Sequence, residues 1–319
     1  MWQIKIMWDI LLDSLIDCAK TLPFLLAIYL LIEFLETNKR ARDKTVRLLN
    51  GKLAPLVAGC VGIVPQCGFS VMATDLYVQN YLKTGTLIAF FVATSDEALP
   101  LLLSNGKTVG IVWIVVLVKV VYAVLLGYLI NLFDRRKLAD TYEEHEEEGC
   151  CHHELGEADD HDDHEDGDED DHAHTDGKSK WHKFWEFVNH PLLHTAKIFV
   201  YIFVVNSVFG VLLHYFEQPI MDFSAKLGIF QSFFTAAIGL VPNCASSVIV
   251  TSMYTSGVNG AHIIGLPALL AGLVANSGIA LAVLFRDKKQ IKRNLLIVAI
   301  MYFAGVLCGI GAELVTMLL

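Results

Sequence analysis

Two seven-residue stretches of this chain combine side chains that can bind an ion with a residue that interrupts a helix. Residues 64–70 read VPQCGFS and residues 241–247 read VPNCASS. Both lie in apolar runs, where proline removes a backbone hydrogen bond and breaks the helix. In lipid, a broken backbone is tolerated only where it is buried in protein or lines a wet cavity. The candidate ion-binding residues of these motifs are Gln66, Cys67, Ser70, Asn243, Cys244, Ser246 and Ser247.

The two motifs belong to a longer internal repeat. Pro65 and Pro242 are 177 positions apart, and the same offset relates Thr74 to Thr251. It serves about sixty residues without a gap, from the pair 19 and 196 to the pair 77 and 254. The sequence therefore predicts two similar halves, each with one copy of the motif.

A pair of adjacent carboxylates stands out in the first half. Asp96 and Glu97 lie inside the otherwise apolar segment 85–103. A charge at the centre of a bilayer costs about 2.5–3.5 kcal/mol, so these groups need a cation. We expect Asp96, with Glu97 or Asp75 as a second carboxylate, to bind a divalent ion or the coupling proton. The alternative is an internal salt bridge to Lys119.

A third candidate site is an acidic insertion between the halves. Residues 140–176 contain nineteen Asp and Glu and no Lys or Arg. Such a segment cannot bury a core, and we expect it to be disordered without a ligand. Imidazole, carboxylate and thiolate together suit transition metals, so the tract predicts metal capture. Its candidate ligands are His145, Cys150, Cys151, His152, His153, His161, His164, His172 and His174.

Composition places the rest of the chain in a membrane. The sequence is 54% hydrophobic, its mean hydropathy is +0.50, and its apolar runs repeatedly exceed eighteen residues. The net charge of −10 comes from the insertion, since the remainder carries 24 basic against fifteen acidic residues. No cysteine spacing predicts a disulfide framework. No cleavable signal peptide is readable.

Eight apolar segments are expected, and the positive-inside rule decides how they cross. If each motif segment, 53–82 and 227–254, crossed the membrane once, 13 Lys and Arg residues would lie inside and 8 outside. If each segment returns as a hairpin to the side where it entered, 18 lie inside and 3 outside, which fits the rule better. With hairpins, each half crosses the membrane fully three times. Because this number is odd, the second half has the opposite orientation in the membrane to the first. The expected full spans are 8–35, 85–103, 109–133, 192–213, 261–285 and 295–318.

The predicted fold is therefore an all-α polytopic membrane protein. It has two inverted repeats, each with three full spans and one broken, re-entrant helical hairpin, about ten helices in all. We expect a first membrane repeat over residues 1–134, a cytoplasmic disordered loop over 135–183 and a second repeat over 184–319. The amino terminus is expected outside. No histidine accompanies Cys67 or Cys244, so no nucleophilic site is readable and we do not expect an enzyme.

At this point the chain resembles the ten-helix heavy-metal exporter family related to the ArsP permeases. Members of that family in bacteria are described as manganese transporters. The residues that carry the resemblance are residues 65–70, 95–100 and 242–244, with the His/Asp-rich insertion between the halves. The resemblance implies a transporter of metal or metalloid species in the bacterial inner membrane.

The leading hypothesis is a secondary exporter of divalent transition-metal ions, manganese first and zinc or iron next, working by alternating access at the two motifs. One alternative is an arsenic-species permease in which Cys67 and Cys244 bind the metalloid. Another is a membrane metal sensor or storage protein that does not transport. The expected partners are the lipid bilayer and metal ions, with no nucleic acid and a homo-oligomer left open. No cofactor is expected beyond the transported ion and metal held by the loop.

Overall fold

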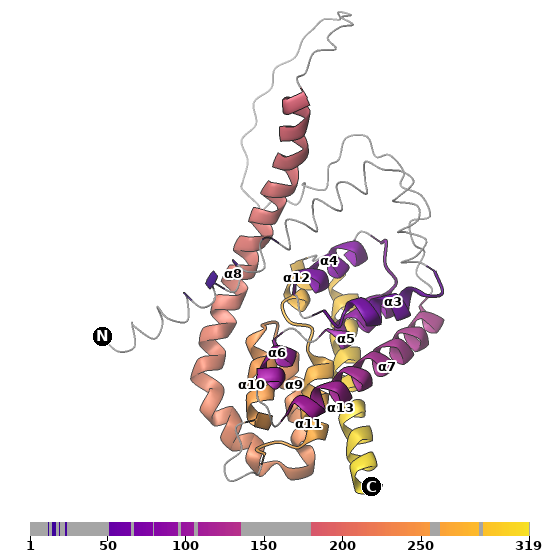
Figure 1. Ribbon diagram of the computed structural model, residues 1–319, viewed down its shortest axis with the longest axis vertical. Coiled ribbons are helices and arrows are strands. Elements are labelled where there is room, and N and C mark those ends of the chain that lie inside the picture. Colours follow the sequence, from indigo (N-terminus) through magenta and orange to yellow (C-terminus); the bar gives the residue numbers. More distant parts are fainter. Residues whose placement is uncertain are drawn as a thin grey trace, which may run out of the picture.

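The structure is a computed structural model. It describes residues 12, 15–16, 19, 23, 51–64, 67–78, 80–94, 97–104, 108–134, 180–255, 262–286 and 290–318; for Cys67, Ile229 and residues 180–198 it describes the backbone alone. Every regular element in these ranges is helical (Figure 1). Four parts of the prediction lie outside the described residues: the acidic tract at 140–176, Gln66, Asp96 and the first predicted span, of which only five helical positions between 12 and 23 are described.

The first half contains five described helices. They are α3 (Ala54–Val61), α4 (Cys67–Val78), α5 (Thr84–Ala93), α6 (Ala98–Ser104) and α7 (Val109–Phe133). The long α8 (Lys180–Lys226) runs along one side of the molecule (Figure 1). After a short 3₁₀ turn, η1 (Gly228–Phe230), the second half contains α9 (Gln231–Gly239), α10 (Ala245–Thr255), α11 (Leu266–Ala275), α12 (Ala280–Arg286) and α13 (Ile291–Leu318).

Five segments among the described residues are long and apolar enough to cross a membrane. They are Thr84–Ser104, Val109–Phe133, Phe199–Lys226, Leu266–Arg286 and Ile291–Leu318. They differ in burial: 94% of the apolar window in Leu266–Arg286 is covered by protein, against 22% in Val109–Phe133. The exposed apolar side chains of α7, such as Trp113 and Leu132, suit contact with lipid tails. The chain is therefore a polytopic helical membrane protein whose central segments are shielded by outer ones.

Both motif segments are interrupted where the sequence predicts. The gap between α3 and α4 contains Pro65, and the gap between α9 and α10 contains Pro242. Proline cannot donate the hydrogen bond that would continue the helix. The predicted breaks are confirmed.

Two further breaks were not predicted. The segments 85–103 and 261–285 were expected as uninterrupted spans, but the first divides into α5 and α6 and the second into α11 and α12. Pro100 lies in the first turn of α6, where its missing N–H is tolerated. In the other break Gly278 adopts φ = 57°, a left-handed conformation that glycine adopts without steric cost.

The boundaries of the helices repeat between the halves. The starts of α3 and α9 and the ends of α4 and α10 differ by 177 positions. From α5 onward the starts differ by 182: Thr84 corresponds to Leu266, Ala98 to Ala280. The starts of α7 and α13 keep that offset. Five additional residues between α10 and α11 therefore account for the whole change in register, and each half contains the same series of five helices.

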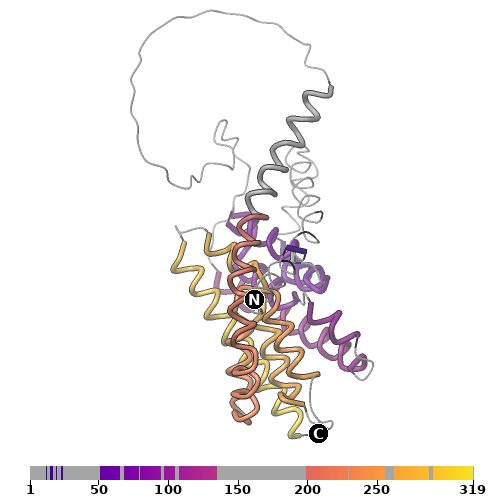
Figure 2. Tube along the Cα trace, turned by 90° about the vertical axis from the view of Figure 1, so that its left-hand side faces the viewer, coloured from indigo at the N-terminus to yellow at the C-terminus, as the bar shows by residue number. Residues whose placement is uncertain are grey.

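Packing follows the same correspondence. Within the halves α5 packs on α3 and α7, and α11 packs on α9 and α13. Between the halves α4 packs against α12, α10 against α6, and α5 against α11. Small residues allow close approach: a Cβ added to Gly127 of α7 would lie 2.7 Å from the Cβ of Ala89 in α5. The second half and α8 form a bundle from which α7 diverges (Figure 2).

Candidate functional site

A buried lysine joins the ends of two interrupted helices from different halves. Lys119, on α7, is only 1% exposed, and its Nζ donates to the backbone oxygens of Thr94 at 2.5 Å and Leu273 at 2.8 Å. Thr94 caps the carboxyl end of α5, and Leu273 lies in the last turn of α11. Carbonyls at a helix end lack partners within the helix and carry partial negative charge. The ammonium group satisfies both ends at once.

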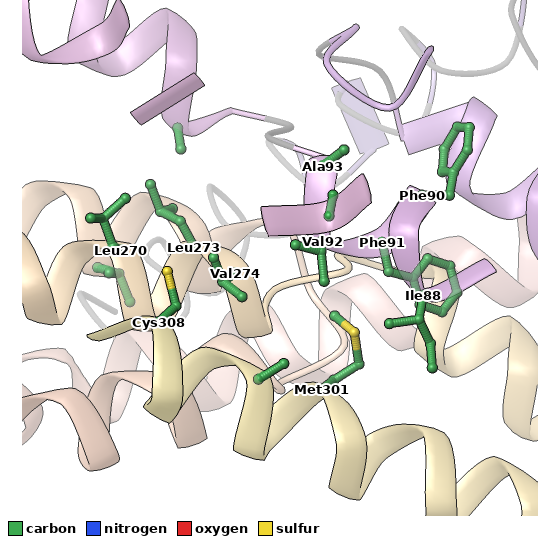
Figure 3. Packing of buried hydrophobic residues seen from close by; sticks show 14 of the residues in the cluster. Ile88, Phe90, Phe91, Val92, Ala93, Leu270, Leu273, Val274, Met301 and Cys308 are labelled. Atoms are coloured by element: carbon green, nitrogen blue, oxygen red, sulfur yellow. The ribbon is translucent and has the colours of Figure 1, made fainter. Parts of the chain in front are cut away.

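The surroundings of this lysine are apolar. Figure 3 shows the last residues of α5, including Val92 and Ala93, and those of α11, including Val274, lying above α13. Met301 and Cys308 of α13 belong to the same buried cluster. A charge in such a place is costly unless it is paired and hydrogen-bonded. The two carbonyls are therefore the described groups that make the position of Lys119 tolerable.

The second motif is held by the side chain of Asn243. Its Oδ1 accepts a hydrogen bond of 2.7 Å from the N–H of Ala245, the first residue of α10. Its Nδ2 donates to the backbone oxygen of Asn206 in α8 at 2.9 Å. Asparagine commonly bonds the backbone two residues ahead in this way. The side chain of Asn243 thus caps the amino-terminal end of α10 and also hydrogen-bonds the break to α8.

A second asparagine links the two breaks of this half. Asn276, the residue that ends α11, accepts at Oδ1 from the N–H of Gly278 at 3.0 Å and from Oγ of Ser246 at 3.3 Å. Ser246 Oγ also lies 2.8 Å from the backbone oxygen of Asn243. All of these side chains except the glycine are at most 2% exposed. The break at 240–244 and the break at 276–279 are therefore parts of one buried polar network.

Several oxygen atoms around this network have no hydrogen-bond partner. They are Oδ1 of Asn206 and Oγ of Ser207 on α8, Oγ1 of Thr251 on α10, and Oγ of Ser277 in the break before α12. Each of these residues is at least nine-tenths buried. Native proteins leave few buried polar atoms unsatisfied, and such atoms occur where a ligand, ion or water binds.

The predicted site residues fall into three groups. The second-half residues Asn243 and Ser246 come together with Asn276, and Ser247 Oγ lies 2.8 Å from the backbone oxygen of Cys244. In the first half Cys67 begins α4 and Ser70 accepts a hydrogen bond from Thr74 within that helix. Asp75 and Glu97 are half-buried. The positions of Gln66 and Asp96 are outside the described residues, so the expected carboxylate pair stays a prediction.

Four residues of the site were missed by the sequence analysis. Asn206, Ser207, Asn276 and Ser277 each lie in an apolar run, where an isolated asparagine or serine pair is the available signal. The salt bridge between Lys119 and Asp96 stays a prediction because Asp96 lies outside the described residues, and the described hydrogen bonds of Lys119 to backbone carbonyls were not predicted. Backbone acceptors leave no mark on a sequence, which is why this contact could not be foreseen.

The described atoms offer hydroxyl, amide and carbonyl oxygens, the thiols of Cys244 and Cys308 and the ammonium of Lys119. Among the described residues no three His, Cys, Asp or Glu side chains form a group that could hold a metal ion. Metal binding by the tract at 140–176 and by Asp96 therefore remains a prediction.

The described part of the chain forms only helices as its regular elements and includes five candidate membrane spans, so the protein is a multi-pass membrane protein. The chain belongs to the family described as "Putative, 10TM heavy-metal exporter", whose model matches residues 3–191. By that description the family is one of transporters. Neither the curated proteins nor the solved structures include a match to this chain.

Proposed function

We propose that this protein exports divalent transition-metal ions, manganese first and zinc or iron next, as a secondary transporter. Membership of a heavy-metal exporter family supports the substrate class. Asp96, Glu97 and Asp75 supply carboxylates, which suit manganese. The tract at 140–176 would collect the ion on the cytoplasmic side. We place the protein in the bacterial inner membrane, with the amino terminus outside.

The mechanism that we propose is alternating access between two inverted repeats of about ten helices in all. The observation that carries it is the contact of Lys119 with the ends of α5 and α11, because this joins the interrupted helices of the two halves at one buried point. Repeats that meet at broken helices can rock about such a point and open the site to either side. The proposed domains are residues 1–134, the loop 135–183 and residues 184–319.

A second candidate is a permease for arsenic species. The described part of the site contains the thiol of Cys244 and the ammonium of Lys119, and no group of three metal-ligating side chains. A fixed positive charge repels a bare divalent cation, whereas a neutral metalloid is not repelled and binds thiols. In this case Cys67 and Cys244 would hold the substrate and the tract would be incidental.

Flux into vesicles containing the full chain separates these candidates. Manganese, zinc and arsenite would be offered in turn to the parent and to Asp96→Asn, Cys67→Ser and Cys244→Ser. We expect manganese flux in the parent and at least a tenfold loss in Asp96→Asn. Cys60→Ser is the matched control, since Cys60 is an exposed free cysteine on α3 outside the motif. Arsenite flux that either motif cysteine abolishes, without manganese flux in the parent, would establish the second candidate instead.

Deletion of residues 140–176 tests the third class of function. An exporter should keep its flux with a changed dependence on metal concentration. A sensor or storage protein should show no flux before the deletion and lose its metal response after it.

A further inference from the structure

The breaks of the second half enclose oxygen atoms that have no partner. We propose that these breaks form a binding site for a small monovalent metal cation, for which sodium is the probe. The proposal rests on the proposed function, because in a secondary exporter such an ion would supply the coupling. Its central ligands are Oδ1 of Asn206 and Oγ of Ser277.

The unsatisfied atoms are the first argument for a ligand. Asn206 Oδ1 and Ser277 Oγ are buried without a hydrogen-bond partner, and Ser277 is 0% exposed. Burial removes the water that would otherwise solvate them, so each atom is unfavourable as it stands. An amide oxygen can only accept. What completes this site must therefore be a cation or a hydrogen-bond donor.

The residues that carry these two atoms, Asn206 and Ser277, lie next to one hydrogen-bond network that spans four elements. On α8, the backbone oxygen of Asn206 accepts from Nδ2 of Asn243. Oγ of Ser246 on α10 lies 2.8 Å from the backbone oxygen of Asn243 and 3.3 Å from Oδ1 of Asn276, which directly precedes Ser277. The start of α12 also packs on α8, since Tyr201 donates to the backbone oxygen of Ala282 at 2.8 Å. Side chains from α8, the α9–α10 break, α10 and the α11–α12 break are thus held around one buried region.

The chemistry of these ligands selects the charge of the ion. The oxygens of this network belong to amides, hydroxyls and backbone carbonyls, and none carries a formal charge. A divalent ion requires carboxylates to offset its charge. A monovalent cation is satisfied by neutral oxygens at the ends of broken helices. The amide oxygen of Asn206 cannot donate to an anion, so this atom favours a cation.

The equivalent place in the first half has a different character. There the sequence provides Asp96 and Glu97, and the structure adds Lys119. The second-half counterparts are Gly278, Ile279 and Met301, all uncharged. This difference supports separate roles for the two breaks. The charged α5–α6 break would bind the heavy-metal substrate, and the neutral α11–α12 break would bind a monovalent ion.

The test measures ion binding and transport on the same full-length protein. Thermal unfolding of the detergent-solubilised chain would be followed in sodium, potassium and choline chloride at constant ionic strength. We expect sodium to raise the unfolding temperature above its value in choline, with saturation. Ser277→Ala and Asn206→Leu should weaken sodium binding at least tenfold. Ser224→Ala is the matched control, because Ser224 is also a buried, unpartnered hydroxyl on α8 but is not hydrogen-bonded into this network.

The outcomes separate the two proposals. Equal unfolding temperatures in all three salts, or unchanged sodium binding in Ser277→Ala, would overturn the cation site and leave a buried water as its occupant. Ser277→Ala removes one oxygen atom and so decides the question even if Asn206→Leu does not fold. Intact metal flux without any effect of sodium refutes only the cation site. Sodium binding without flux of any heavy metal refutes the proposed export and leaves the cation site standing.

Discussion

The α5–α6 break and the α11–α12 break occupy equivalent places in the two halves, but their chemistry differs. Both follow a ten-residue helix and precede a seven-residue one, at a constant offset of 182. The first contains charged residues and the second only neutral ones. The corresponding pairs are Thr94 and Asn276, Asp96 and Gly278, Glu97 and Ile279, and Lys119 and Met301.

The two halves share the same order of helices and breaks, but the side chains at equivalent positions differ. In the first half an ammonium group binds carbonyls at the carboxyl ends of α5 and α11. In the second half the side chain of Asn276 ends the helix by accepting from Gly278 and Ser246. Both devices satisfy polar groups that a break would leave exposed to an apolar interior. They leave different charges at the two breaks, and the two ion sites that we propose rest on this difference.

The largest effect is expected from Lys119→Met, which gives α7 the residue that α13 has at Met301. The carbonyls of Thr94 and Leu273 lose their donor, at a cost of about 1–3 kcal/mol for each group left unsatisfied. The hydrogen-bonded link between the ends of α5 and α11 is then lost, and we expect metal flux to fall at least tenfold. Flux into vesicles and thermal unfolding would both be measured.

Two controls accompany that change. Lys119→Arg keeps donors that can reach both carbonyls, so it should retain more flux than Lys119→Met. Lys226→Met removes an exposed lysine at the end of α8 and should change nothing. Parent-like flux in Lys119→Met would show that the contact between the halves plays no part in transport.

A smaller effect is expected from Gly305→Ala, which gives α13 the residue that α7 has at Ala123. A Cβ at Gly305 would lie 2.6 Å from the backbone oxygen of Ala271 and 2.9 Å from the Cβ of Ala275. The neighbours of α13 therefore have no room for the methyl group that α7 accommodates. We expect the free energy of unfolding to fall by about 1–3 kcal/mol, as for other overpacked sites. Denaturant unfolding in detergent would measure it.

Gly311→Ala is the control for that substitution. Gly311 lies on the same helix, and nothing lies within 4 Å of its added Cβ. Alanine is the better helix former by about 1 kcal/mol, so this change should be neutral or stabilising. Equal destabilisation by both changes would mean that the close approach of α11 and α13 does not limit stability.

These differences also mark how far the sequence could be interpreted. The motif breaks, the span 109–133 and the offset of 177 were all predictable, because proline and apolar runs act locally. The second break in each half was not, since no proline lies between α5 and α6 and the oxygen of Thr94, which ends α5, is bound by the distant Lys119. The role of Asn276 depends on Ser246, thirty positions away. Hydrogen bonds to a distant backbone carbonyl, such as that of Leu273, follow from packing and not from local pattern.

The smallest effect is expected from Asn243→Gln, which gives the second motif the carboxamide that Gln66 supplies in the first. The longer side chain cannot keep Oδ1 at 2.7 Å from the N–H of Ala245 while its amide nitrogen reaches Asn206. Losing one of these bonds should lower the free energy of unfolding by about 1 kcal/mol. Ser252→Ala, which removes a hydroxyl bonded within α10 itself, should stay within about 0.5 kcal/mol of the parent. If Asn243→Gln matched the parent in stability and sodium response, the two carboxamides would be interchangeable. The length of the side chain at position 243 would then not matter for the second-half site.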